Sequence, residues 1–268
     1  MTLNTTDDTE FCDYERLKRY LLLVSLIPAY IPQEIIDELE DMIKPVYFGI
    51  EFVTHHLCKH LFYEEFKKVL EESTDMFDSS EIECAQFLLS RCIMLCDEPE
   101  PTYFNFLLVA TFLKESVLRL FHEYKCYRML YIGDFCFDVL YNRLFRKVFE
   151  SREVYENLEL FCQEFLKLFT PDTTQSEFQD STFGKYCIRF VEERFNVNND
   201  SFSLTESEVE LFETFYSVES KANQEEWPIL RETENAESAY FDARKHYPSD
   251  CETCGSRCSD YLNYMSLL

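Results

Sequence analysis

Glycine and proline are scarce in this chain, which has 4 Gly and 8 Pro among 268 residues. Glycine supplies the positive-φ positions of tight turns, so its shortage argues against a fold built from many β-hairpins. The shortage also argues against a glycine-rich phosphate loop, and the sequence contains no P-loop, dinucleotide fingerprint or serine nucleophile elbow. From these absences we expect a protein that is not an enzyme.

Basic residues and long apolar runs are also in short supply. Lys and Arg number 25 against 51 Asp and Glu, which gives a net charge of −26. Such a charge repels duplex DNA and anionic lipid and attracts basic protein segments. The longest apolar runs, such as "YLLLVSLIPAYI", are too short to span a bilayer, and the first residues, "MTLNTTDDTEFCDYE", are polar and acidic. We therefore expect protein partners and no membrane.

Cysteine, in contrast, is plentiful at 12 residues. Most of the cysteines lie among apolar residues at helical spacing, as in "CAQFLLSRCIMLC", where Cys behaves as a small buried hydrophobic residue. This pattern favours reduced thiols in the cytoplasm or nucleus. The alternative is a disulfide-rich secreted protein.

Helical periodicity dominates the rest of the chain. Apolar spacing predicts helices at about 10–27, 33–44, 46–72, 80–96, 101–121, 130–150, 152–169, 176–195, 203–221 and 229–245. No segment alternates at period two for long enough to predict a sheet. We expect an all-α fold of about nine or ten helices, either an irregular helical bundle or a degenerate helical-repeat solenoid. Residues 1–222 would form the helical domain, and 223–268 an acidic C-terminal segment with a short helix and a Cys-rich tail.

Two details refine these helices. Ser80 with Glu83, and Ser203 with Glu206, have the spacing of a capping box and predict helix starts. The segment 101–121 is apolar on nearly every face, which predicts a central buried helix with Leu107 and Leu118 in the core.

The candidate metal ligands lie near the end of the chain. His246, Cys251, Cys254 and Cys258 fall within 13 residues, and Cys-x2-Cys is a spacing that grips zinc. The alternatives are an iron–sulfur cluster held by three thiolates and a tail with free thiols. Because the tail has little apolar bulk, we expect truncation after Pro248 to leave the helical domain folded.

A second histidine motif, "THHLCKH", places His56 and His60 four residues apart on one helix face. The metalloprotease signature requires Glu directly after the first His, and Leu57 occupies that position. We therefore interpret the pair as a partly exposed helix face.

One stretch opposes the average charge. Residues 114–152 carry eight basic and five acidic side chains. Within it, Arg143, Arg146 and Lys147 are candidate contacts for an acidic peptide or a phosphate. The alternative is that they pair with the chain's own acidic helices.

Together these features predict a non-enzymatic adaptor or regulatory subunit that binds partner proteins through helical grooves and favours basic segments. An alternative is a metal-binding regulatory protein whose C-terminal zinc knuckle contacts a protein or RNA. A third is a helical-bundle enzyme with a site assembled from residues distant in sequence.

Overall fold

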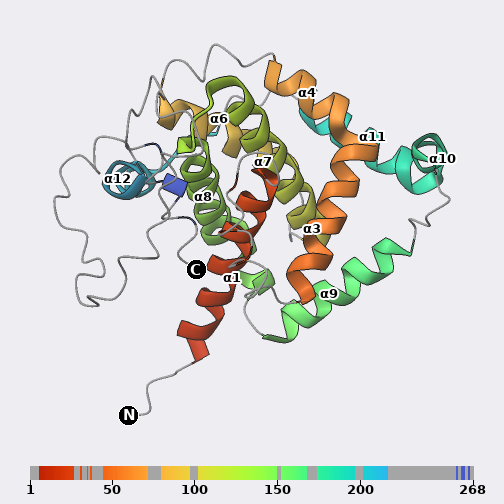
Figure 1. The fold of residues 1–268 in the computed structure, drawn as a ribbon, viewed down its shortest axis with the longest axis horizontal. Helices are drawn as coiled ribbons and strands as arrows, with labels where there is room; N and C mark the ends of the chain where they lie inside the picture. The colour runs from red at the N-terminus through yellow and green to blue at the C-terminus, as the bar shows by residue number, and fades with distance from the viewer. Residues whose placement is uncertain are drawn as a thin grey trace.

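The structure is a computed structural model that describes residues 6–26, 31, 35, 37, 45–71, 80–96, 102–149, 152–167, 174–196, 202–216, 258, 261, 262 and 265. Helix dominates these residues, and they contain no strand. Nine continuous helical segments run through the described part of the chain and pack into a bundle (Figure 1). The prediction of an all-α fold with about nine or ten helices is confirmed.

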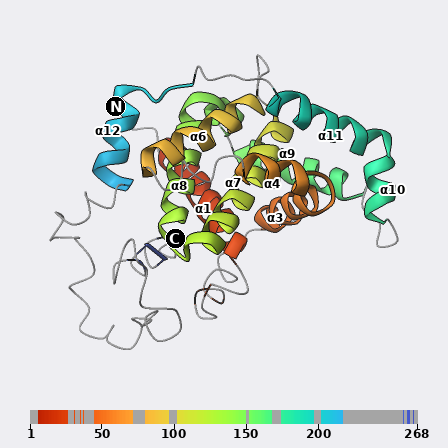
Figure 2. The same ribbon diagram turned by 90° about the horizontal axis from the view of Figure 1, so that it is seen from above.

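The α-helices in chain order are α1 (Thr6–Leu26), α3 (Pro45–Leu57), α4 (Tyr63–Glu71), α6 (Glu81–Met94), α7 (Tyr103–Tyr124), α8 (Arg128–Leu140), α9 (Arg152–Leu166), α10 (Gln175–Asp180), α11 (Thr182–Phe195) and α12 (Glu206–Leu211). Four short turns continue them: η1 (Cys58–Phe62), η2 (Tyr141–Phe145), η3 (Arg146–Phe149) and η4 (Phe212–Tyr216). The two ribbon views place α12 and α10 at opposite ends of the molecule (Figures 1 and 2).

Helix α7 lies in the middle of the bundle, where it contacts α1, α3, α6 and α8 (Figure 1). It begins at a capping box in which the Thr102 hydroxyl accepts the Asn105 amide and the Asn105 side chain accepts the Thr102 amide. Leu107 is fully buried, as its all-apolar surroundings predicted. Leu118 is only partly buried, because it lines a cavity between the helices.

Aromatic side chains fill the contact between α7 and the end of α8. The ring of Phe106 lies 5.5 Å from that of Phe145 and 4.8 Å from that of Phe149, both edge to face. Tyr14 of α1 closes the cluster, and its hydroxyl donates a 3.0 Å hydrogen bond to the carbonyl of Phe137. Edge-to-face contacts between large rings are one way in which a chain rich in Phe and Tyr fills its core.

A buried ionic cluster joins α1 to α8. Lys18 is only 1% exposed, and its ammonium lies 3.1 Å from Asp134 and 2.9 Å from Glu15. It also pairs with Asp138, which accepts a hydrogen bond from the Tyr216 hydroxyl of η4. Burial is tolerated because the charge has several partners of opposite sign.

The helix predicted at 176–195 is interrupted at Ser181. This residue is extended, and its side chain accepts the Gly184 amide at 2.9 Å, so it ends α10 and caps α11. A Cβ at Gly184 would lie 2.1 Å from the carbonyl oxygen of Phe178, so glycine permits the close approach of the two helices. Capping by an internal serine therefore overrides the continuous apolar periodicity.

The two predicted helix starts have different outcomes. Ser80 caps α6 as expected and accepts the Glu83 amide at 3.1 Å. The start predicted at Ser203 is wrong by two residues, because Thr205 caps α12 in a box with Glu208. The Ser203 carbonyl instead accepts a hydrogen bond from Arg143. Arg143 also pairs with Glu208 and so stabilises the capping box at Thr205.

Four described residues near the end of the chain pack against the bundle. Cys258, Tyr261, Leu262 and Met265 are buried and belong to the same core cluster as α8. The Tyr261 ring lies 4.5 Å from that of Tyr131, edge to face. The proposed boundary at 222 and the helix at 229–245 lie outside the described residues, as does most of the helix predicted at 33–44.

Candidate functional site

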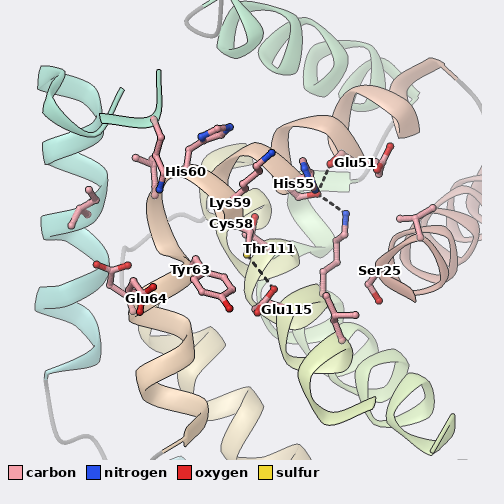
Figure 3. A pocket seen from close by; sticks show the side chains of 18 of the residues that line it. Ser25, Glu51, His55, Cys58, Lys59, His60, Tyr63, Glu64, Thr111 and Glu115 are labelled. Carbon is pink, nitrogen blue, oxygen red and sulfur yellow. Dashed lines mark hydrogen bonds between the residues drawn. The ribbon is translucent and has the colours of Figure 1, made fainter. Parts of the chain in front are cut away.

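A cavity of about 1270 Å³ opens between α1, the continuous α3–η1–α4 segment, α7 and the α10–α11 corner (Figure 3). A volume of this size exceeds that of a small-molecule site and suits several side chains of a partner. Its wall is mixed, with apolar residues such as Val24 and Leu118 and many charged or polar ones. The cavity is therefore the candidate functional site.

The π-helical turn η1 shapes one wall of the cavity. It inserts into an otherwise regular helix and brings Cys58, Lys59, His60 and Leu61 to the cavity, while Phe62 is buried in the core. The wider turn shifts the backbone hydrogen-bonding register, and the Gln179 side chain of α10 donates to the His60 carbonyl at 2.8 Å. The turn thus links the cavity wall to the α10–α11 corner. The apolar spacing of 46–72 gave no signal of this irregularity.

Lys114 of α7 forms the floor of the cavity. Its side chain is 9% exposed, and its ammonium donates a 2.9 Å hydrogen bond to the Thr54 hydroxyl. Thr54 in turn donates to the Glu51 carbonyl one turn back in α3. Burial lowers the pKa of Lys114 to about 8, and Glu51 and Cys58 only partly oppose this effect.

A second polar group lies beside the floor. The Cys58 thiol donates to the Glu115 carboxylate at 3.3 Å, and Figure 3 shows the two side chains facing each other between η1 and α7. Glu115 also accepts a 2.6 Å hydrogen bond from Arg119, whose guanidinium lies over the Tyr63 ring. Burial, with a further contribution from Glu115, raises the pKa of the Cys58 thiol well above its usual range. The thiol therefore stays protonated and is a poor nucleophile.

Aromatic rings form a row along the outer side of α3 and η1. Phe48, Phe52, His56 and His60 recur every four residues, and successive ring centroids lie 6.5, 4.0 and 5.3 Å apart. Phe48 is 58% exposed and Phe52 38%, while Phe48 and His60 also line the cavity. Burial lowers the pKa of His60, so this end of the row favours a neutral imidazole. We name Phe48, Phe52, His56 and His60 the ring row.

The predicted pair His56 and His60 therefore belongs to a stack of rings. His56 makes a 2.9 Å contact through Nδ1 with the Phe52 carbonyl. Within the described residues no three His, Cys, Asp or Glu side chains are placed to hold a metal ion. The partly exposed helix face expected from the sequence agrees with this arrangement.

Three of the four candidate zinc ligands, His246, Cys251 and Cys254, lie outside the described residues. Cys258 is described and buried. Its sulfur accepts the Tyr127 amide at 3.3 Å and lies 3.8 Å from the Cys126 sulfur. Zinc binding by the four residues stays a prediction.

The candidate basic contacts Arg143, Arg146 and Lys147 differ in their surroundings. Arg143 pairs with Glu208 at 2.7 Å, donates to the Ser203 carbonyl and lies 4.8 Å from the Phe202 ring centroid. These contacts match the alternative of internal pairing. Arg146 and Lys147 are exposed on η3, and their role as partner contacts stays a prediction.

Another residue of the basic stretch, Lys114, lines the cavity and is buried. The charge count of residues 114–152 gave no indication of this burial. The available signal was the place of Lys114 in the segment 101–121, which is apolar on nearly every face.

Comparison with known protein families, curated proteins and solved structures found no match for this chain. In the part of the chain that the structure describes, no helix combines the length and apolar character needed to cross a membrane.

Proposed function

We propose that the protein is a non-enzymatic adaptor or regulatory subunit that receives a segment of a partner protein in the cavity. The observation that carries this proposal is the combination of a large cavity, a buried polar floor and an exposed aromatic rim. Exposed aromatic groups beside a pocket are the usual anchors of protein–protein binding. Phe48 and Phe52 have this character, and solvation of these rings is costly in the free protein.

The charge of the molecule supports a basic segment as the partner. Glu64 and Glu65 line the cavity beside α11, and burial raises the pKa of Glu65, with a further contribution from Glu192 and Glu64. A cation from a partner would relieve this crowding of carboxylates. The net charge of −26 would steer basic segments to the surface and speed association.

The proposal includes a reducing compartment, the cytoplasm or the nucleus, and no binding of duplex DNA. In its support, the nine cysteines whose side chains the structure describes form no disulfide bond, and eight of them are buried. Buried unpaired cysteines are common where thiols stay reduced.

Partner recovery by variants of the rim tests this function. We expect Phe48→Ser to lose the proteins that co-purify with the wild-type chain from the native cell. Phe215→Ser is the matched control, since Phe215 is 56% exposed and lies on η4, outside the cavity lining. Quantitative mass spectrometry compares the two. Loss of the same partners from Phe215→Ser, or their retention by Phe48→Ser, would remove the cavity rim as the binding site.

A further inference from the structure

The buried ammonium of Lys114 has hydrogen-bonding capacity that the fold does not use. A lysine ammonium has three N–H donors. Among the described residues, the Lys114 ammonium forms one hydrogen bond, to the Thr54 hydroxyl. No described carboxylate lies within 4.0 Å of the ammonium nitrogen. Two donors therefore stay open at the floor of a cavity.

The nearest carboxylates do not take these donors. Glu115 is engaged by Arg119 and Cys58. Glu51 acts on Lys114 through its charge without forming an ion pair, and its carbonyl already binds Thr54. Thr54 is oriented by that bond, so it holds the Lys114 ammonium in a fixed position. In the described part of the chain, the floor thus presents a cation without a carboxylate at ion-pair distance.

The other buried lysine shows how this fold pairs such a charge. Lys18 has Asp134, Asp138 and Glu15 around its ammonium. Both lysines lie on core helices, yet only Lys18 is neutralised by the chain. A buried charge without a partner costs free energy, which a ligand of opposite sign would recover.

We propose that Lys114 binds the side-chain carboxylate of an acidic residue in the partner segment, so that the preferred partner is a basic segment with one embedded acidic residue. This inference rests on the proposed function. One carboxylate would accept a hydrogen bond from an open N–H donor and would neutralise the single positive charge of the ammonium. A phosphate dianion would need more donors and would meet greater repulsion from Glu51, Glu64 and Glu115, which line the same cavity. Glu64 and Glu65, which line the same cavity, would hold the flanking basic side chains.

Acetate is the simplest probe of the Lys114 donors. Sodium acetate, titrated against sodium chloride at equal ionic strength, should give saturable shifts of the Lys114 side-chain signals in nuclear magnetic resonance. Lys114→Met should weaken acetate binding by about tenfold or more, the scale expected when one member of a buried charge pair is removed. Lys59→Met is the matched control, since Lys59 lines the same cavity but is exposed. It should keep acetate binding.

Wild-type protein gives a readout that does not depend on the variant folding. The acetate methyl should show Overhauser contacts with the Thr54 methyl. Absence of these contacts together with the absence of saturable shifts would overturn the inference. Equal loss in Lys59→Met would also overturn it, because the effect would then be general surface electrostatics.

Two further arms identify the source of the anion. Inorganic phosphate that binds more tightly than acetate would refute the carboxylate assignment. Two blocked heptapeptides, with arginine at both ends and glutamate or glutamine at the centre, test for a partner side chain. We expect the glutamate peptide to bind more tightly, and only while Lys114 is present. Acetate binding without this preference would indicate a small carboxylic acid and would overturn the proposed partner residue.

The inference and the proposed function fail separately. If acetate binds at Lys114 while Phe48→Ser keeps every partner, the anion site is supported and the docking function is contradicted. If Phe48→Ser loses its partners while acetate shows no dependence on Lys114, the docking function stands and the carboxylate inference falls.

Discussion

At the residue scale, two buried lysines differ in their surroundings, and this difference indicates a structural role for Lys18 and a binding role for Lys114. Lys18 joins α1 to α8 through Asp134 and Asp138, and these carboxylates raise its pKa. Lys114 has a hydroxyl and an open cavity, and burial lowers its pKa to about 8 from an ordinary value of 10.5. The first arrangement holds helices together, whereas the second leaves a charge for a ligand.

The depressed pKa of Lys114 predicts a pH dependence of stability. Between about pH 8 and 10.5 the unfolded chain holds more protons at this lysine than the folded chain. The free energy of unfolding therefore gains a contribution that rises with pH across this window. We expect the stability of wild type relative to Lys114→Met to increase from pH 8 to 10, as measured by urea unfolding.

The comparison with Lys114→Met removes the effects of Lys18 and of the buried thiols, which titrate in both proteins. The raised pKa of Lys18 acts in the opposite sense, because its stabilisation is complete below about pH 10.5 and is lost as the pH rises above the folded-state value. A difference between wild type and Lys114→Met that stays constant with pH would mean that the Lys114 amine is well solvated.

The sequence could indicate that residue 114 is basic and helical but could not show its surroundings. Thr54 lies 60 positions earlier in the chain, and Cys58 lies 57 positions before Glu115. Side-chain partners at such separations depend on how α3 packs against α7. Arg143 illustrates the same point, because its partner Glu208 lies 65 positions later.

At the scale of the element, periodicity predicted the long helices well and their irregular parts poorly. The segments 46–72 and 101–121 agree with α3–η1–α4 and α7 to within a few residues. The π turn η1 and the break at Ser181 leave the apolar spacing intact, so periodicity does not detect them. These two irregularities shape the cavity wall and its α10–α11 corner.

The C-terminal residues provide a prediction at this scale. The sequence predicted that truncation after Pro248 would leave the helical domain folded, but Tyr261, Leu262 and Met265 are buried in the core. We now expect truncation to lower the melting temperature markedly, and Leu262→Ala alone to cost about 2 to 4 kcal/mol. Thermal unfolding measures the first and urea unfolding the second.

Leu160→Ala is the control for Leu262→Ala, because Leu160 is 57% exposed and should tolerate the change with little loss. A truncated chain that unfolds at the same denaturant concentration as wild type would show that the C-terminal residues add no stability to the bundle.

For the whole molecule, charge and shape support the same interpretation. A net charge of −26 acts at long range on any basic segment, whereas the cavity and the ring row act only at contact. Electrostatic attraction would set the rate of association, and contacts with the aromatic rim and the buried floor would set the lifetime of the complex. Composition alone predicts the long-range attraction of basic segments. The contact surface depends on the packing of the helices and could not be predicted from composition.

The central claim is that the cavity rim contacts the partner, and site-specific photo-crosslinking tests it most directly. A benzoylphenylalanine at position 48 should form an adduct with a partner segment that carries basic residues, identified by mass spectrometry of the cross-linked peptide. The same group at position 215, which is similarly exposed at a site outside the cavity, should not capture that segment. Adducts of the partner at position 215 with none at position 48 would contradict the account.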